Sequence, residues 1–235
     1  MTPVVSRAVV LPGMDGTGAL LVEFAAALGE QFQVEVIDYP RDRPLDHAGL
    51  REWVRERLPG PDYLLVAESF SGPIALALAA EHPPGMRALV LCASFGQIDL
   101  PFKRALASIA ALMPVRAVPM RLLSHVLWGR WHSRLHQKQL ADVLSSVDPV
   151  VLQCRLRQTL SAQACPVQTL PMPLLYLQAE ADRVVAAGAA AGLASTQPHM
   201  QVRRFDAPHF LLQVRPRECA QAIAAFAAAL PHSGS

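Results

Sequence analysis

Ser69 interrupts two apolar runs in the stretch YLLVAESFSGPIALALAAEHP, residues 63–83. The run before it is typical of a buried strand and the run after it of a helix, which places the serine at a sharp turn. Ala67, Ser71 and Gly72 are small, which lets the strand and the helix approach each other. A helix N-terminus has free N–H groups and favours negative charge. These are the needs of a nucleophile whose attack creates an oxyanion, and a serine that only caps the helix is the alternative.

Predicted strands and helices alternate along the chain around this turn. Most of the strands are continuous apolar runs, which is typical of a parallel sheet covered by helices on both faces. The sequence therefore predicts an α/β fold with a mostly parallel central sheet flanked by helices. The predicted strands are 7–12, 33–40, 63–67, 86–94, 173–182 and 200–207, and the predicted helices are 17–29, 47–58, 70–81, 184–195 and 216–230.

Residues 99–170 break this alternation, because they contain four helical patterns and no convincing strand. We predict a helical cap or lid at 99–170, inserted into a core formed by 1–98 and 171–235. Loops at the carboxyl ends of parallel strands build active sites, so an insertion there would cover the site. The part that faces the serine is expected to be apolar, unless its large side chains only form the core of the cap. The helical patterns are PFKRALASIAALM, MRLLSHVLWGR, LHQKQLADVLSSV and PVVLQCRLRQTLSAQ, and the large apolar residues include Met113, Leu122, Leu123, Leu127, Trp128 and Trp131.

Composition argues against several classes of protein. Hydrophobic residues make up 52% of the chain, enough for a sizeable core. The net charge of +2 and the lack of a basic run argue against nucleic-acid binding, and Arg51, Arg55 and Arg57 are typical of one solvated helix face. We expect no membrane span, no signal peptide and a cytoplasmic location. The four scattered cysteines lack metal-ligand spacing and are expected to be free, mostly buried thiols: Cys92, Cys154, Cys165 and Cys219.

At Ser69 the sequence resembles the α/β-hydrolase superfamily, whose nucleophile elbow has the form G-x-S-x-G. The corresponding stretch here is A-E-S-F-S followed by Gly72, so the next smallest residues replace both glycines. LPGMDGTG, after the first predicted strand, resembles the oxyanion loop of the superfamily. The resemblance implies an oxyanion hole formed by the backbone N–H groups of Met14 and Phe70. A tight strand–helix turn is the alternative, and the glycine spacing does not match a dinucleotide-binding loop.

The resemblance also implies a carboxylate partner for the serine. Asp182, in QAEADRVV, lies just past a predicted strand, where the superfamily places its catalytic acid. Glu180 is two residues away and could serve instead. Asp99, after the strand 86–94, is a further alternative that some members use. An ordinary loop carboxylate is the structural alternative for each of them.

His209, in RFDAPHFLLQVRP, fits the catalytic histidine of the superfamily, because it follows the last strand and precedes the final helix. The order Ser69, Asp182, His209 is the order of the triad in this fold. The other seven histidines are expected to be structural or exposed, although His125 and His132 lie in the insertion and could line a pocket.

The resemblance implies a serine hydrolase that acts on a carboxylic ester or thioester with an apolar portion, through an acyl-enzyme on Ser69. Such chemistry requires no metal and no organic cofactor, and the expected partner is a small acyl substrate. The PGMDGTG loop also resembles that of plant plastid acyltransferases of the phytyl-ester type and of small bacterial hydrolases. Acyl transfer to an alcohol is therefore an alternative. Perhydrolysis and carbon–carbon bond hydrolysis stay open, as does an inactive ligand-binding homologue if Ala67 and Ser71 spoil the oxyanion geometry.

Glu68 stands directly before the proposed nucleophile, and the sequence leaves its role open. It could meet a partner at the edge of the sheet. It could instead act on the site electrostatically, because a carboxylate near His209 would favour the imidazolium and raise its pKa. The sequence carries no signal for the oligomeric state.

Overall fold

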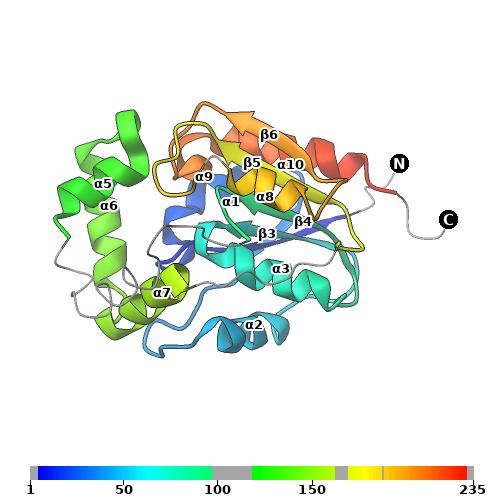
Figure 1. Cartoon of the computed structure of the whole chain (residues 1–235), viewed down its shortest axis with the longest axis horizontal. Helices are drawn as coiled ribbons and strands as arrows, with labels where there is room; N and C mark the ends of the chain where they lie inside the picture. The colour runs from blue at the N-terminus through cyan, green and yellow to red at the C-terminus, as the bar shows by residue number, and fades with distance from the viewer. Residues whose placement is uncertain (1–4, 97–117, 162–168, 187, 232–235) are drawn as a thin grey trace.

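The computed structural model of the 235-residue chain describes residues 5–96, 118–161, 169–186 and 188–231. Six parallel strands form one sheet in the order β2-β1-β3-β4-β5-β6 (Figure 1). This confirms the predicted α/β fold and its parallel sheet. The strands are β1 (Arg7–Leu11), β2 (Gln33–Val36), β3 (Tyr63–Glu68), β4 (Met86–Cys92), β5 (Leu174–Ala179) and β6 (Gln201–Phe205).

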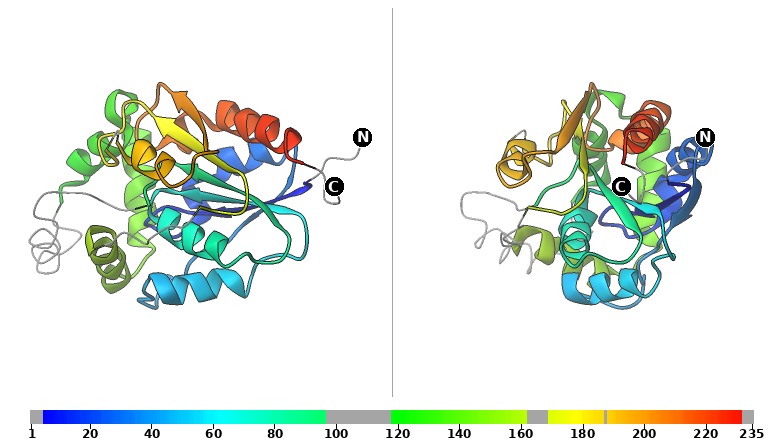
Figure 2. Two further views of the ribbon diagram at one scale, coloured as in Figure 1. Left: turned by 45° about the vertical axis from the view of Figure 1, so that its right-hand side comes forward. Right: turned by 90° about the vertical axis from the view of Figure 1, so that its right-hand side faces the viewer.

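Helices cover both faces of the sheet, as the two views of Figure 2 show. On one face lie α1 (Val22–Leu28) and α10 (Pro216–Ala228), and on the other lie α2 (His47–Arg55), α3 (Gly72–Ala80) and α8 (Ala189–Ala194). Alternate residues of a strand point to opposite faces. Val66 therefore packs in the core cluster under α1 and α10, while its neighbour Leu65 packs in the cluster under α2 and α3. Both faces of the four central strands β1, β3, β4 and β5 are buried, which is why these strands are nearly continuous apolar runs. The edge strands β2 and β6 are partly or largely exposed and carry polar residues.

Several elements differ in length from the prediction. The strand expected at 33–40 ends at Val36, and the helix expected at 184–195 is reduced to α8. The helix expected at 17–29 is split into a short 3₁₀ turn, η1 (Gly18–Leu20), and α1. The short helix α9 (Leu211–Val214), which follows His209, was not predicted. These differences lie at loops, where contacts with distant residues decide how far a local pattern extends.

Helices α5 (Met120–Trp128), α6 (Arg134–Ser145) and α7 (Pro149–Ser161) lie between β4 and β5 in sequence, with the 3₁₀ turn η4 (Gly129–Trp131) after α5. They lie beyond the end of the sheet opposite the N-terminus of the chain (Figure 1). We call α5, α6 and α7 the cap helices. They agree with three of the four predicted helices, whereas the helix at 101–113, with Met113, lies outside the described residues. The division into a core and a separate cap stays a prediction.

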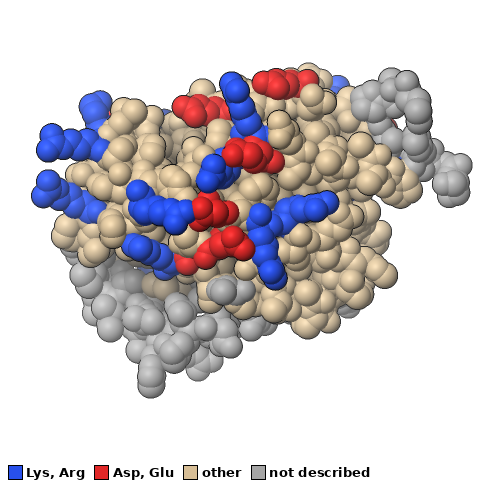
Figure 3. All heavy atoms as spheres, turned by 90° about the horizontal axis from the view of Figure 1, so that it is seen from above, with Lys and Arg blue, Asp and Glu red and all other residues tan. Residues whose placement is uncertain are grey.

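Charged side chains gather unevenly on the surface. Basic residues cluster on the cap helices at one end of the molecule, and acidic and basic residues mix beside β6 (Figure 3). Arg51 and Arg55, predicted to form a solvated face with Arg57, form ion pairs with Glu81. The guanidinium of Arg57 lies 3.4 Å from the ring centroid of Trp53.

Cysteines and possible metal ligands are dispersed in the described part of the chain. Cys92 and Cys219 are buried free thiols and Cys154 is partly exposed, while Cys165 lies outside the described residues. Within the described ranges, no group of three His, Cys, Asp or Glu side chains could hold a metal ion. None of the described helices is long and apolar enough to cross a membrane.

Candidate active site

Ser69 occupies a strained turn between β3 and α3. Its φ is +46°, in the left-handed region that is costly for a residue with a side chain. Ser69–Ser71 form a 3₁₀ turn (η2), and α3 starts at Gly72 instead of the predicted residue 70. Ser69 is partly exposed, whereas Phe70 and Ser71 are buried. The turn therefore presents the serine at the surface of an otherwise buried segment.

The small residue that this turn requires is Gly72. A Cβ at Gly72 would lie 1.9 Å from Oγ of Ser94 and 3.0 Å from the carbonyl oxygen of Phe95. Ser94 Oγ donates a hydrogen bond to the carbonyl of Ser69 over 2.6 Å, and the hydroxyl of Tyr176 donates to the carbonyl of Ser94 over 2.6 Å. The segment after β4 thus packs directly against the turn. Neither Ser94 nor Tyr176 is marked by a sequence motif, because their role depends on contacts across strands.

Ser71, which stands in place of the second motif glycine, is fully buried and hydrogen bonded. Its hydroxyl donates to the carbonyl of Pro12 and lies 2.5 Å from the hydroxyl of Tyr39. Because Ser71 has only one proton to give, Tyr39 is the donor of the second bond. Burial raises the pKa of Tyr39 above its ordinary value, which keeps that proton in place. The replacement therefore connects the turn to the loop after β1.

Ser69, His209 and Asp182 form a continuous line of hydrogen bonds. Oγ of Ser69 lies 2.8 Å from Nε2 of His209, and Nδ1 of His209 lies 2.9 Å from Oδ2 of Asp182. The side chains of His209 and Asp182 are only 3% and 6% exposed. A carboxylate accepts hydrogen bonds, so Nδ1 carries the proton and Nε2 accepts from the serine. This is the arrangement in which an imidazole can take a proton from a hydroxyl.

Asp182 is oriented by the turn that follows it. Its Oδ1 accepts hydrogen bonds from the N–H groups of Val184 and Val185 over 2.7 and 2.9 Å, which leaves Oδ2 for the histidine. Glu180, the alternative acid, is exposed, and its carboxylate has no hydrogen bond to any residue that the structure describes. Asp99, the other alternative, lies outside the described residues. Geometry therefore favours Asp182.

The loop between β1 and η1 forms a tight turn beside Ser69. The N–H of Gly16 donates to the carbonyl of Gly13 over 3.0 Å, and Gly16 has a φ of +72°. Asp15 is buried, and its Oδ2 accepts hydrogen bonds from the N–H and from the hydroxyl of Thr17. No acceptor among the described residues is hydrogen bonded to the N–H of Met14. The same is true of Phe70 at the start of η2. The assignment of these two N–H groups to an oxyanion hole stays a prediction.

Glu68, the last residue of β3, connects three parts of the site. Its Oε2 accepts from the N–H of Gly13 over 3.2 Å and its Oε1 accepts from Nε2 of Gln213, in α9, over 2.8 Å. The pKa of Glu68 is raised to about 7, chiefly because burial disfavours the charged form; Asp15 acts in the same direction, and Gln213, His209 and the Gly13 N–H oppose it. Glu68 thus has partners at the sheet edge, one of the two roles that the sequence left open.

Gln213 can also accommodate the protonated form of Glu68. Its Oε1 is buried and has no hydrogen-bond partner in the described structure. The two ends of an amide group are assigned from the hydrogen-bond network. After rotation of the amide by half a turn, a protonated Glu68 could donate to this oxygen. The pair therefore accepts either protonation state of the carboxyl group.

The cap helices contact loops on both sides of Ser69. The N–H of Phe210, next to His209, donates to the carbonyl of Leu127 in α5 over 3.2 Å, and the rings of Trp128 and Phe210 meet edge to face at 4.4 Å. On the other side, Arg155 of α7 donates to backbone carbonyls of the loop after β1. A hollow on the outer surface of the cap is separate from the triad and is lined by Arg121, Arg134, Gln137, Lys138 and Ala141.

The histidines outside the triad have other contacts. His125 lies 3.0 Å from a guanidinium nitrogen of Arg183, and Nδ1 of His132 lies 2.8 Å from the hydroxyl of Ser124. Neither has a hydrogen bond to the triad among the described residues. His47 packs its ring against Phe70, with centroids 5.0 Å apart, a contact with the proposed oxyanion residue that the sequence did not predict.

Residues 44–211 match the model of a protein family described as serine aminopeptidase, S33. The matched range covers more than half of the chain and includes Ser69, Asp182 and His209. It does not include the loop with Met14.

Solved structures of low sequence identity share the fold. A hydrolase from Oleispira antarctica superposes with a TM-score of 0.84 at 15% identity, covering 95% of this chain and 91% of that one. An esterase from Exiguobacterium antarcticum gives a TM-score of 0.79 at 13% identity, covering 94% of this chain and 91% of that one.

A sequence relative matches part of the chain. Phytyl ester synthase 1, chloroplastic, of Arabidopsis thaliana is 39% identical over 79 residues. That match spans 31% of this chain and only 11% of the length of that relative.

Proposed function

Because the chain belongs to the serine aminopeptidase S33 family of α/β-hydrolases, we propose that it is a serine hydrolase that cleaves a carboxylic ester or thioester. The observation that carries this proposal is the line of hydrogen bonds from Ser69 through His209 to Asp182. A serine that merely caps a helix needs no histidine at 2.8 Å and no strained φ. The intact line also favours catalysis over a ligand-binding role without turnover.

In the proposed reaction, Oγ of Ser69 attacks the acyl carbon while its proton passes to Nε2 of His209. Asp182 stabilises the imidazolium, and the N–H groups of Met14 and Phe70 receive the negative charge on the former carbonyl oxygen. Each such donor contributes about 3–4 kcal/mol in comparable sites. The bond to the leaving alcohol or thiol then breaks, and His209 returns the proton to it. Water, deprotonated by His209, attacks the acyl-enzyme and releases the acid and Ser69.

Apolar side chains beside the triad support a substrate with an apolar portion. Trp128, Leu140 and Phe210 form a buried cluster between the cap helices and the loop that carries His209. Phe210 is adjacent to His209 in sequence, so this cluster lies beside the loop that carries the proposed general base. An alkyl or acyl chain bound next to it would transfer its own apolar surface out of water.

Acyl transfer to an alcohol is a second candidate function. The match to phytyl ester synthase 1, whose name describes an ester-forming enzyme, favours it. The first half of the reaction would be unchanged, and an alcohol would replace water as the acceptor of the acyl group. The same triad therefore serves both candidates, and the acceptor decides between them.

The test is hydrolysis of p-nitrophenyl esters with acyl chains from acetate to palmitate, by the wild type and by Ser69→Ala. We expect activity that the substitution abolishes, with a preference for one range of chain lengths. Ser195→Ala is the matched control, because Ser195 is an exposed serine at the end of α8 and should leave activity unchanged. Adding a long-chain alcohol and measuring ester against free acid would distinguish transfer from hydrolysis. Equal rates for the wild type and Ser69→Ala would contradict the proposal.

A further inference from the structure

Arg155 is a buried cation on cap helix α7, with 1% of its surface exposed. Its Nη1 donates to the carbonyls of Met14 and Asp15 over 3.1 and 2.6 Å, and its Nη2 donates to the carbonyl of Pro40 over 2.8 Å. A buried guanidinium is costly unless its N–H groups are hydrogen bonded. All three of these acceptors belong to backbone, and two of them belong to the proposed oxyanion loop.

The two carbonyls that Arg155 binds are the central ones of a four-residue turn. The turn is closed by the hydrogen bond from Gly16 N–H to the Gly13 carbonyl, which leaves Met14 and Asp15 as its middle residues. Peptide groups are planar and trans, so an N–H points away from the carbonyl of its own peptide. Because the Gly13 carbonyl points into the turn, the N–H of Met14 points out of it. Fixing the turn therefore fixes the direction of that N–H.

The surroundings of Arg155 are shaped to receive it. A Cβ at Gly16 would lie 2.2 Å from Nη1, so only a glycine fits against the guanidinium at that position. The guanidinium carbon lies 5.5 Å from the ring centroid of Tyr39, whose hydroxyl bonds to Ser71 in the nucleophile turn. Burial lowers the pKa of Arg155, and nearby Asp15 opposes this shift by favouring the charged guanidinium. One side chain of the cap thus contacts both the loop after β1 and the residue that holds the nucleophile turn.

We infer that Arg155 is a positioning residue, which holds the Gly13–Gly16 turn so that the N–H of Met14 can bind the oxyanion, and through which α7 sets the oxyanion hole. The inference rests on the proposed function of the Ser69 site. It makes the cap part of the catalytic geometry as well as a cover for the substrate. Without Arg155, the carbonyls of Met14 and Asp15 would each lose one hydrogen bond, the carbonyl of Pro40 would lose a third, and the turn could reorient.

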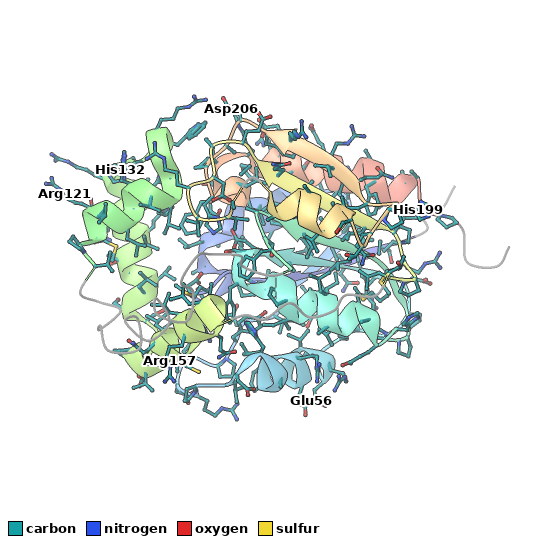
Figure 4. All side chains as sticks on the ribbon, viewed as in Figure 1. Glu56, Arg121, His132, Arg157, His199 and Asp206 are labelled. Atoms are coloured by element: carbon teal, nitrogen blue, oxygen red, sulfur yellow. The ribbon has the colours of Figure 1, made fainter. Side chains whose placement is uncertain are left out.

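The test compares Arg155→Met and Arg155→Lys with Arg157→Met, an exposed position on the same helix (labelled in Figure 4). For Arg155→Met we expect kcat for the preferred ester to fall about 100-fold, the size of effect seen when one oxyanion donor is lost. KM should change little, because the loop acts on the transition state. Lysine keeps the charge but cannot reach all three carbonyls, so Arg155→Lys should be intermediate. Arg157→Met should resemble the wild type.

Two further readouts separate positioning from general loss of structure. A trifluoromethyl ketone adds to a catalytic serine and places an oxyanion in the hole, so its affinity should fall in Arg155→Met by a factor similar to that in kcat/KM. Titration with a fluorophosphonate counts the active sites that remain folded. A kcat per titrated site equal to that of the wild type, with unchanged ketone affinity, would overturn the inference.

Hydrogen exchange tests the turn even without activity. Amides of residues 13–17 should exchange faster in Arg155→Met than in Arg157→Met, while amides of β5 stay protected in both. Equal exchange in the two variants would overturn the inference by itself. Absence of ester cleavage and of fluorophosphonate labelling in the wild type would instead contradict the proposed function, and the exchange result would still decide whether Arg155 holds the turn.

Discussion

Asp182 uses both of its carboxylate oxygens, one for the backbone of its own turn and one for His209. In Asp182→Asn the amide group keeps the shape but donates where the carboxylate accepted. Nδ1 of His209 would then lose its proton, and Nε2 could no longer take one from Ser69. We expect kcat for an ester substrate to fall by about 10⁴, as for the comparable substitution in other triads.

Glu180→Gln is the matched control for this substitution. Glu180 is exposed, two residues away in sequence and without a described hydrogen bond to the histidine. Its activity should remain within about twofold of the wild type, since an exposed side chain away from the site has little effect on it. A large loss of activity in Glu180→Gln, together with an active Asp182→Asn, would show that Glu180 is the catalytic carboxylate. Circular dichroism should show both variants folded.

At this same scale, the sequence could identify the three side chains but not their supports. Ser69 and Asp182 each follow a strand that is visible as an apolar run, and His209 follows the polar edge strand β6. The parallel sheet brings the ends of these strands together. Ser94 and Tyr176 belong to no motif, because they support the nucleophile turn through hydrogen bonds that form only when distant segments pack together. Only the small size of Ser71 can be read from the motif, whereas its hydrogen bonds to Pro12 and Tyr39 depend on the folded structure.

Helix α3 can start where it does because its first residue has no side chain. Gly72→Ala would place a Cβ 1.9 Å from Ser94 Oγ, and this hydroxyl is held by its bond to the Ser69 carbonyl. Relief requires moving Ser94 or the nucleophile turn. We expect a loss of about 1–3 kcal/mol in the free energy of unfolding, as for other overpacked sites, together with reduced kcat. Urea unfolding and ester hydrolysis measure the two effects.

Gly192→Ala gives the opposite result on another helix. Gly192 lies inside α8, and a Cβ there meets no atom within 4 Å. Alanine in a helix interior is favoured over glycine by up to about 1 kcal/mol, so this variant should be slightly more stable and equally active. If Gly72→Ala were as stable as Gly192→Ala, the close approach of α3 to Ser94 would not hold the turn.

Helices and strands could be predicted from the sequence where their own residues determine them. They were harder to predict where contacts with distant residues determine them. The continuous apolar strands and the amphipathic helix α2 are set by their own residues. Helix α9 is only one turn long and depends on its packing under the sheet, so no periodicity marks it. Arg155 lies in a helix that was predicted, but its partners are backbone carbonyls more than a hundred residues away. Every residue has a backbone carbonyl, so the type of a residue does not reveal that its carbonyl will bind Arg155.

At the scale of the whole molecule, Glu68 couples folding to pH. Its pKa in the folded chain is about 7, against an ordinary value of 4.5, chiefly because burial disfavours the charged form. Between these two pH values the folded chain keeps a proton that the unfolded chain releases. The free energy of unfolding should therefore fall as pH rises through this range and level off above about pH 7, with a total change on the order of 3 kcal/mol.

Glu68→Gln should remove most of this pH dependence. Glutamine is neutral at every pH in the range, has the same shape and can still accept from the Gly13 N–H. A smaller slope of the same sign should remain, because burial also raises the pKa of Asp15. Glu56→Gln, an exposed carboxylate on the surface (labelled in Figure 4), is the control and should keep the wild-type slope. Urea unfolding from about pH 5 to pH 8 measures all three proteins. If the wild type and Glu68→Gln ran parallel, Glu68 would be ionised in the folded chain throughout, and its bonds to Gly13 and Gln213 would be those of a carboxylate at every pH where the protein is folded.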